Sequence, residues 1–283
     1  MKRFVACLLL ILTVSVITAV TAKEKRAQVW AQDNLVAWCI VPFDAKKRGP
    51  SERAEMVAQL GIKKVAYDWR GEHVATFEEE ILQYKKHGIE FFAFWSWHDA
   101  IGPLIKKHGI QPQVWRTLSS PKKGTQQEKV AAAAKAMLPL AAKTKALGLK
   151  LGLYNHGGWG GEPANMVAVC QALRKQGHEQ VGIVYNFHHG HGQVGNFSAN
   201  LAAMKPYLHC LNLNGMSGKE QKFQKILPLG RGQNEQAMMQ AIQDSGYHGP
   251  IGILGHVANR DVEVVLKENL EGFRTITGFL KKQ

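Results

Sequence analysis

Short apolar runs alternate with amphipathic stretches along most of this chain. Eight runs have the apolar content and the length of buried strands. They cover residues 34–43, 62–70, 89–98, 110–118, 149–158, 181–189, 208–216 and 249–256. The segments between them carry apolar residues at helical spacing, and most end in glycine, which commonly follows a helix. Helices are therefore predicted over residues 51–61, 76–88, 100–109, 128–148, 162–177, 197–207, 234–246 and 261–282.

This alternation predicts the fold class. Apolar strands that alternate with helices indicate a parallel sheet covered by helices. Eight such units in about 250 residues match a single α/β barrel of the (β/α)8 TIM type. An open, doubly wound sheet is the alternative, but no GxGxxG turn follows the first predicted strand. We therefore expect one barrel domain over residues 35–283.

The N-terminal segment predicts export. Lys2 and Arg3 precede an apolar run over residues 4–20, and small residues stand at its end, before a polar stretch. These are the features of a signal peptide, here residues 1–22, cleaved before Lys23. An uncleaved anchor helix is the alternative, because the run is near the lower length limit for crossing a membrane. We expect a bacterial periplasmic or secreted protein with no stable membrane insertion after cleavage.

Charge and cysteine content narrow the range of partners. The formal charge of +14 favours anionic surroundings such as cell-wall polymers or acidic sugars. Many lysines lie on predicted helix faces, where they are ordinary solvated surface, so no nucleic-acid partner is expected. Once Cys7 has left with the signal peptide, Cys39, Cys170 and Cys210 lack the close spacing of a disulfide framework or zinc knuckle. We expect these three to be buried thiols.

Polar and aromatic side chains gather at the predicted strand ends. In a TIM barrel the chemistry lies at the C-terminal ends of the strands. The residues at these ends are Asp68, Arg70, Trp97, His98, Arg116, Tyr154, Asn155, His156, Asn186, His188, His189, His191, Asn212, Asn214 and His256. Because they occupy equivalent ends, the sequence predicts one pocket on one face of the barrel.

Several of these segments carry a family resemblance. They read LGLYNHGGW, VGIVYNFHHGH, LHCLNLNGM and GRGQNE followed by GYHGPI. In content and order they resemble the xylose isomerase-like TIM-barrel family, which includes sugar and sugar-phosphate isomerases and epimerases, inosose dehydratases and apurinic endonucleases. The resemblance runs from Leu35 to the C-terminus. It implies a carbohydrate or a sugar-derived small molecule as the ligand.

The family holds a divalent metal with four side chains, and this chain departs from that set. The family's glutamate, aspartate, histidine and second glutamate correspond here to Tyr154, Asn186, Asn212 and Leu254. A hard divalent ion requires anionic oxygen, which these residues do not supply, so no metal cofactor is expected. The alternative is a rebuilt transition-metal site that uses His156, His188 or His191.

The resemblance implies an exported isomerase, epimerase or lyase that transfers a proton next to a sugar carbonyl. His189 matches the family's DxxH histidine, and it is the expected base because imidazole titrates near neutral pH. Asp68 and Glu162 are the acidic alternatives. The side chains expected to complete the catalytic set, by stabilising the oxyanion, are Asn186, His156 and Asn212.

The remaining polar residues of the predicted pocket are assigned to the substrate. Those expected to bind it are Asp68, Arg70, His98, Asn155, Trp159, His188, Asn214, Arg231 and His256. The candidate stacking faces for a sugar ring are Trp38, Trp97, Trp115 and Trp159. Barrel packing is the more ordinary role for each indole, and Trp159, in a Gly-rich loop, is the best exception. A non-catalytic sugar-binding or accessory protein on the same barrel is the second hypothesis. An apurinic endonuclease is disfavoured, because the carboxylates and histidines of its metal cluster are absent.

Overall fold

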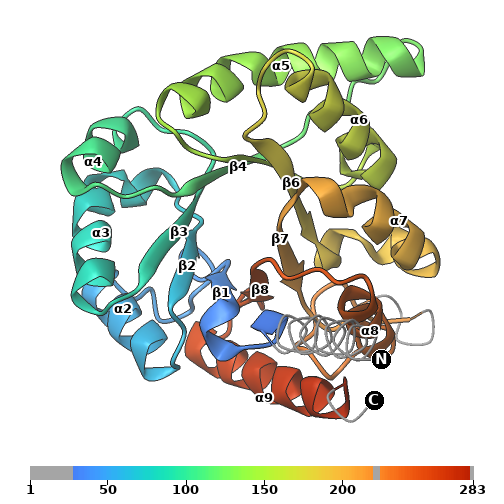
Figure 1. The fold of residues 1–283 in the computed structure, drawn as a ribbon. Helices are drawn as coiled ribbons and strands as arrows, with labels where there is room; N and C mark the ends of the chain where they lie inside the picture. Colours follow the sequence, from blue (N-terminus) through green and yellow to red (C-terminus); the bar gives the residue numbers. More distant parts are fainter. Residues whose placement is uncertain (1–27, 219–223, 281–283) are drawn as a thin grey trace, which may run out of the picture.

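Eight parallel strands close into a barrel in the computed structural model, which describes residues 28–218 and 224–280. Neighbouring strands follow chain order around the ring, and Figure 1 looks down it. The strands are β1 (Leu35–Trp38), β2 (Lys64–Tyr67), β3 (Glu90–Trp95), β4 (Gln113–Thr117), β5 (Leu151–Tyr154), β6 (Val181–Asn186), β7 (Leu208–Leu213) and β8 (Ile251–Leu254). Each lies within a predicted apolar run, and the TIM-barrel prediction is confirmed.

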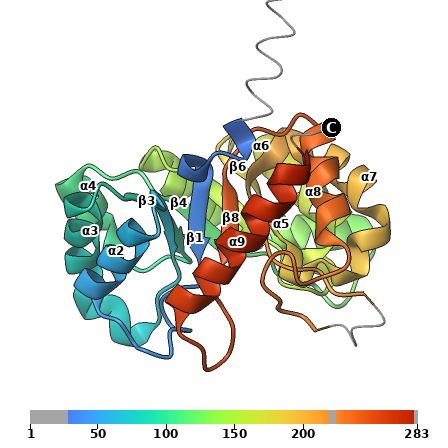
Figure 2. The ribbon, with the colours of Figure 1, turned by 90° about the horizontal axis from the view of Figure 1, so that it is seen from below.

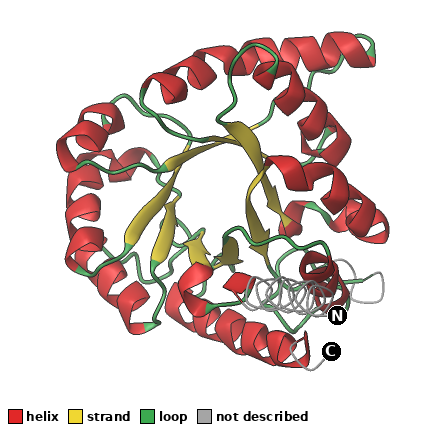
Figure 3. Ribbon diagram, in the orientation of Figure 1, coloured by secondary structure: helices red, strands yellow, loops and turns green. Residues whose placement is uncertain are grey.

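Helices form the outer layer of the barrel. They are α2 (Pro50–Gln59), α3 (Phe77–Lys86), α4 (Ile101–His108), α5 (Gln126–Ala146), α6 (Pro163–Arg174), α7 (Phe197–Met204), α8 (Glu235–Asp244) and α9 (Val262–Leu280). Figure 3 shows this red ring of helices around the yellow strands. In the view turned by 90°, α9 runs along the outside of β8 (Figure 2). All eight predicted helices are present.

Two apolar cores hold the layers together. The larger one lies between strands and helices, and a smaller one fills the barrel interior. Trp115 occupies the interior, where its Nε1 donates to Gln113 Oε1 at 2.9 Å. A Cβ atom on the neighbouring Gly152 would lie 2.9 Å from the Trp115 ring, so the glycine makes room for the indole. Trp115 is thus core packing, the more ordinary of the two roles considered for it, and not a stacking face for a sugar.

The three cysteines within the described chain are free and buried. This confirms the expectation of buried thiols for Cys39, Cys170 and Cys210. The apolar interior supplies the reason, because a thiol packs there as a small hydrophobic group.

The predicted signal peptide, residues 1–22, lies outside the described residues, so its cleavage stays a prediction. Across residues 28–218 and 224–280, none of the helices combines the length and apolar character that a membrane span requires.

Candidate functional site at the barrel mouth

A cavity of about 330 Å³ opens at the C-terminal ends of the strands. Most polar residues of its lining stand at strand ends: Asp68 comes after β2, Tyr154 ends β5, and His188 and His189 come after β6. The complete lining is Trp38, Cys39, Phe43, Asp68, Arg70, Trp95, Tyr154, His156, His188, His189, Lys225, Ile226 and His256. The chain therefore has a polar, aromatic pocket on the face where the sequence predicts one.

Three imidazoles form a cluster on one side of this cavity. The His189 ring lies 4.2 Å from that of His156 and 3.8 Å from that of His188, centroid to centroid. Burial lowers the pKa of His188 to about 3, and the charge of Lys225 acts in the same direction. Burial also lowers the pKa of His189 to about 2, helped by the neighbouring histidines. His188 and His189 are therefore neutral at physiological pH.

Asp68 is the carboxylate of the cavity lining. Its side chain is 2% exposed, and its Oδ1 accepts a hydrogen bond from the Val41 amide at 3.2 Å. The other oxygen, Oδ2, has no hydrogen-bond partner among the described residues. Burial raises the pKa of this carboxyl to about 7, against the opposing effect of the Arg70 charge. Near neutral pH the group can therefore both accept and release a proton.

The Tyr154 hydroxyl accepts two hydrogen bonds at the bottom of the cavity. Trp38 Nε1 donates to it at 3.3 Å, and Asn186 Nδ2 donates from the end of β6. The Asn186 amide is oriented by its Oδ1, which accepts from the His188 backbone amide at 3.2 Å. Because both acceptor sites of the hydroxyl are used, its own hydrogen is left to donate to a third group. Burial raises the Tyr154 pKa well above its usual value, so the hydroxyl stays protonated.

Asn155 and Asn212 lie behind this network in buried positions. Asn155 Nδ2 donates to the backbone carbonyl of Asn186 at 3.0 Å, and the backbone N–H of Asn186 donates back to Asn155 Oδ1 at 2.7 Å. This pair joins the ends of β5 and β6. Asn212 stands opposite Asn186 in the sheet register and is fully buried. A Cβ on the adjacent Gly252 would lie 1.8 Å from Asn212 Oδ1, so this glycine makes room for the amide inside the barrel.

The structure separates the predicted site residues into three groups. Those that line the cavity are Asp68, Arg70, His156, His188, His189 and His256. Asn186 and Asn212, from the predicted catalytic set, are buried in the barrel, and Asn186 reaches the cavity through Tyr154. The remainder, which do not line the cavity, are His98, Asn155, Trp159, Asn214 and Arg231.

For most of the third group the contacts show what the side chain does instead. His98 Nδ1 accepts from the Ala100 amide at 3.1 Å, and its ring packs on Trp69. Trp159 Nε1 donates to the Gln126 side chain at 2.9 Å. Asn214 Nδ2 donates to the Gly215 carbonyl at 2.9 Å. The cavity lining therefore gives no support to their predicted contact with substrate.

Sequence reasoning missed several residues of the lining, namely Cys39, Phe43, Trp95, Lys225 and Ile226. Cys39 and Ser96 have positive φ angles of 57° and 58°, which interrupt the extended backbone. For this reason β1 and β3 end before the predicted apolar runs do. The end of β3 therefore falls at Trp95, three residues before the His98 that the apolar run suggested. Lys225 lies in the loop between β7 and α8, where no sequence pattern marks it.

The residues present do not fit the divalent metal of the family that the sequence resembles. At the corresponding positions Tyr154 and Asn186 bond to each other, and Leu254 is 1% exposed within the apolar barrel interior. No group of three or more histidine, cysteine or acidic side chains could hold a metal ion in the described parts of the chain. The clustered imidazoles pack ring against ring, which gives no support to the rebuilt histidine site.

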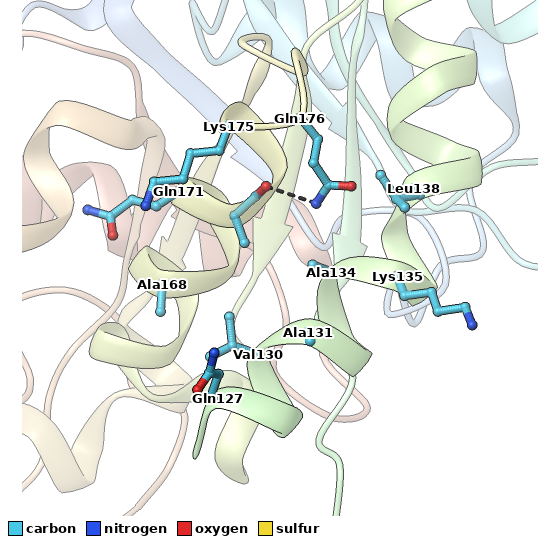
Figure 4. A pocket seen from close by; sticks show the side chains of 11 residues that line it. Gln127, Val130, Ala131, Ala134, Lys135, Leu138, Ala168, Gln171, Lys175 and Gln176 are labelled. Carbon is cyan, nitrogen blue, oxygen red and sulfur yellow. Dashed lines mark hydrogen bonds between the residues drawn. The ribbon is translucent and has the colours of Figure 1, made fainter. Parts of the chain in front are cut away.

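A second hollow lies outside the barrel, between α5 and α6. It measures about 700 Å³, and its lining combines apolar residues with Gln and Lys side chains (Figure 4). The dashed contact in Figure 4 joins Gln176 Nε2 to the carbonyl of Ala172. Although it is larger than the mouth cavity, its lining lacks acids, histidines and nucleophiles, so the barrel mouth is the better candidate site.

Comparison with known proteins agrees with the barrel. Residues 104–276 match the family model described as a xylose isomerase-like TIM barrel. Among solved structures, 3-keto-D-glucoside 4-epimerase from E. coli shares 12% identity, with 88% of this chain and 99% of that chain covered and a TM-score of 0.62.

Two further structures are similar. D-psicose 3-epimerase with D-tagatose, from Clostridium cellulolyticum H10, shares 12% identity over 88% of this chain and 98% of that chain, with a TM-score of 0.57. A probable 3-DHS dehydratase from Bacillus anthracis shares 13% identity over 82% of this chain and 97% of that chain, with a TM-score of 0.61. These identities show a shared fold. No curated protein matches the sequence.

Proposed function

Because the chain belongs to the xylose isomerase-like TIM barrel family, we propose that it transfers a proton at a carbon next to a sugar carbonyl. The reaction class is isomerisation, epimerisation or β-elimination. Two of the structural neighbours are sugar epimerases and one is a dehydratase, which supports this class. We further propose that the reaction proceeds without the family's divalent metal and outside the cytoplasm.

One observation carries the proposal: a candidate base, Asp68, and a candidate hydrogen-bond donor, Tyr154, line the same cavity. Asp68 presents an unpartnered carboxylate oxygen, and its pKa of about 7 suits a base at neutral pH. Tyr154 presents the hydroxyl hydrogen that its two neighbours leave free. Proton abstraction next to a carbonyl places negative charge on the carbonyl oxygen, and a preorganised donor stabilises that charge.

The proposed step uses these two groups together. Asp68 takes the proton from the carbon, the electron pair moves into the new carbon–carbon double bond, and the carbonyl oxygen becomes an enolate oxygen bonded to Tyr154. Protonation of the same carbon on its other face, by solvent, gives the epimer. Protonation of the former carbonyl carbon, with transfer of the adjacent hydroxyl proton to the enolate oxygen, gives the isomer. Loss of a leaving group from the next carbon gives the elimination product.

This assignment changes the role expected for His189. A histidine with a pKa of about 2 is a poor proton acceptor, whereas Asp68 has the basicity that the step needs. We propose that His189, His188 and His156 bind sugar hydroxyls as neutral imidazoles. Asn186 acts as a positioning residue, because its amide holds the Tyr154 hydroxyl.

A solvent-exchange experiment tests the proposal. The wild-type protein is incubated with a panel of keto sugars in D₂O, and deuterium incorporation next to the carbonyl is followed by NMR. We expect exchange by the wild type and its loss in Asp68→Asn, which keeps the shape of the side chain and removes the base.

A non-catalytic sugar-binding protein is the second candidate. The observation that favours it is the replacement of the family's anionic ligands by Tyr154, Asn186 and Leu254. Binding of a panel sugar without any exchange of its protons would support this second function and contradict the first.

A further inference from the structure

Two cationic side chains reach the mouth cavity from loops that are distant in sequence. Arg70 follows β2, and Lys225 lies between β7 and α8. Arg70 Nη1 donates to the backbone carbonyls of Asp68 and Trp69 at 2.7 and 2.8 Å, and the guanidinium lies 5.5 Å from the Phe43 ring centroid. Neither cation belongs to an ion pair within residues 28–218 and 224–280.

The other side chains of the lining balance these two positive charges only in part. Asp68 is the one carboxylate that lines the cavity in the described chain. The imidazoles of His188 and His189 are neutral, because burial and nearby positive charge lower the pKa of both. Buried His188 Nδ1 also has no hydrogen-bond partner among described residues, so it remains available to a ligand. The cavity thus combines uncharged polar groups with an excess of positive charge.

We propose that the ligand of this cavity is a sugar acid: a monosaccharide whose carboxylate is held by Arg70 and Lys225. In the form that acts as the base, Asp68 is ionised, and two cations and one carboxylate then leave a net charge of +1 in the lining. One carboxylate neutralises that charge, whereas a phosphate monoester carries about −1.5 to −2 at pH 7 and overcompensates it. The inference rests on the proposed function, since it names the substrate class of the same site.

The size and the aromatic wall of the cavity agree with a single sugar ring. Its volume of about 330 Å³ is near the lower end of small-molecule sites, which span roughly 300–1,000 Å³. Half-buried Trp95 lines the cavity and lies 4.8 Å from the Tyr154 ring, so its indole can contact the apolar face of a sugar. This contact leaves the carboxylate to be oriented by the two cations.

Calorimetric titration of the full protein tests the proposal without requiring turnover. The probes are a panel of hexuronates and aldonates, each compared with its neutral parent sugar and with the corresponding sugar phosphate. We expect at least one sugar acid to bind about tenfold or more tightly than its neutral parent, the scale of one charge-assisted hydrogen bond. The preference should weaken as the salt concentration rises, because the cavity is open to solvent.

Charge-removing variants locate the effect. Lys225 is exposed, so Lys225→Gln is expected to fold normally and to lower sugar-acid affinity about tenfold with little effect on the neutral sugar. Arg70→Gln is the second variant, checked by its melting temperature because Arg70 also bonds to the backbone. Lys123→Gln is the matched control: it removes the same charge from the exposed loop after β4, outside the cavity lining.

The outcomes separate this inference from the proposed function. Equal or tighter binding of the neutral sugars, tighter binding of the sugar phosphates, or no binding of any sugar acid overturns the inference. Loss of affinity in Lys123→Gln equal to that in Lys225→Gln also overturns it. Selective binding of a sugar acid that shows no proton exchange supports the inference and contradicts the catalytic function.

Discussion

Removing the Tyr154 hydroxyl tests the hydrogen-bond network that stands at the family's metal-ligand positions. In Tyr154→Phe the ring keeps its contacts with Trp38 and Trp95, while Trp38 Nε1 and Asn186 Nδ2 lose their acceptor. Both side chains are buried, and a buried donor left without a partner costs about 1–3 kcal/mol. Two such donors lower the free energy of unfolding by about 2–6 kcal/mol.

Asn186 cannot recover this loss by rotating its amide. Its Oδ1 already accepts from the His188 backbone amide, and an exchange of oxygen and nitrogen would break that bond. Urea unfolding followed by circular dichroism measures the change in stability. For a barrel of this size we expect the melting temperature to fall by at least about 4 °C.

A matched tyrosine gives the control for this experiment. Tyr207 also bonds through its hydroxyl, which accepts from Gln171 Nε2 at 2.9 Å in an exposed position. Tyr207→Phe is therefore expected to change the free energy of unfolding by less than about 0.5 kcal/mol. Equal stability of Tyr154→Phe and the wild type would refute the network. In the exchange assay Tyr154→Phe should also lose about a hundredfold in rate, with sugar affinity nearly unchanged.

Five further predictions remain, and all but the last concern the same site. Between pH 4 and 7 Asp68 is ionised in the unfolded chain, whereas in the folded protein, with a pKa of about 7, it keeps its proton. The free energy of unfolding of the wild type should therefore fall as pH rises. Relative to Asp68→Asn, urea titrations should show a loss of up to about 4 kcal/mol across this window. The wild-type exchange rate should rise with pH through about 7, where Asp68 becomes the active base; a flat profile would contradict its role. His189→Ala should lower the exchange rate or sugar affinity about tenfold, whereas His178→Ala, before β6 at the opposite end of the barrel, should alter neither. Prolonged dialysis against chelator should leave the exchange rate unchanged; a metal-dependent rate would contradict this expectation. N-terminal sequencing of the exported protein should begin at or near Lys23, and an intact N-terminus on cytoplasmic protein would contradict the predicted cleavage.

The elements of the fold could be predicted because their signals are local. Each strand of a TIM barrel is covered on both faces, so it appears as a nearly continuous apolar run, and each covering helix shows its own spacing. The number and order of these units then leave few architectures. The face that holds the site follows from the same reasoning, because all parallel strands end on one side. For this reason the sequence also placed Asp68, His188 and His189 at the mouth.

The selection of side chains within that face required the tertiary structure. Asn155 and His156 are neighbours at the end of β5, yet Asn155 turns to the β6 backbone and His156 to the cavity. Lys225 enters the site from a loop, which no periodic pattern governs. The exchange of roles that we propose between His189 and Asp68 depends on burial, since desolvation lowers the pKa of an imidazole and raises that of a carboxyl. Residue types along the chain determined what chemistry the mouth could contain, and packing in three dimensions determined which groups reach it and in which protonation state.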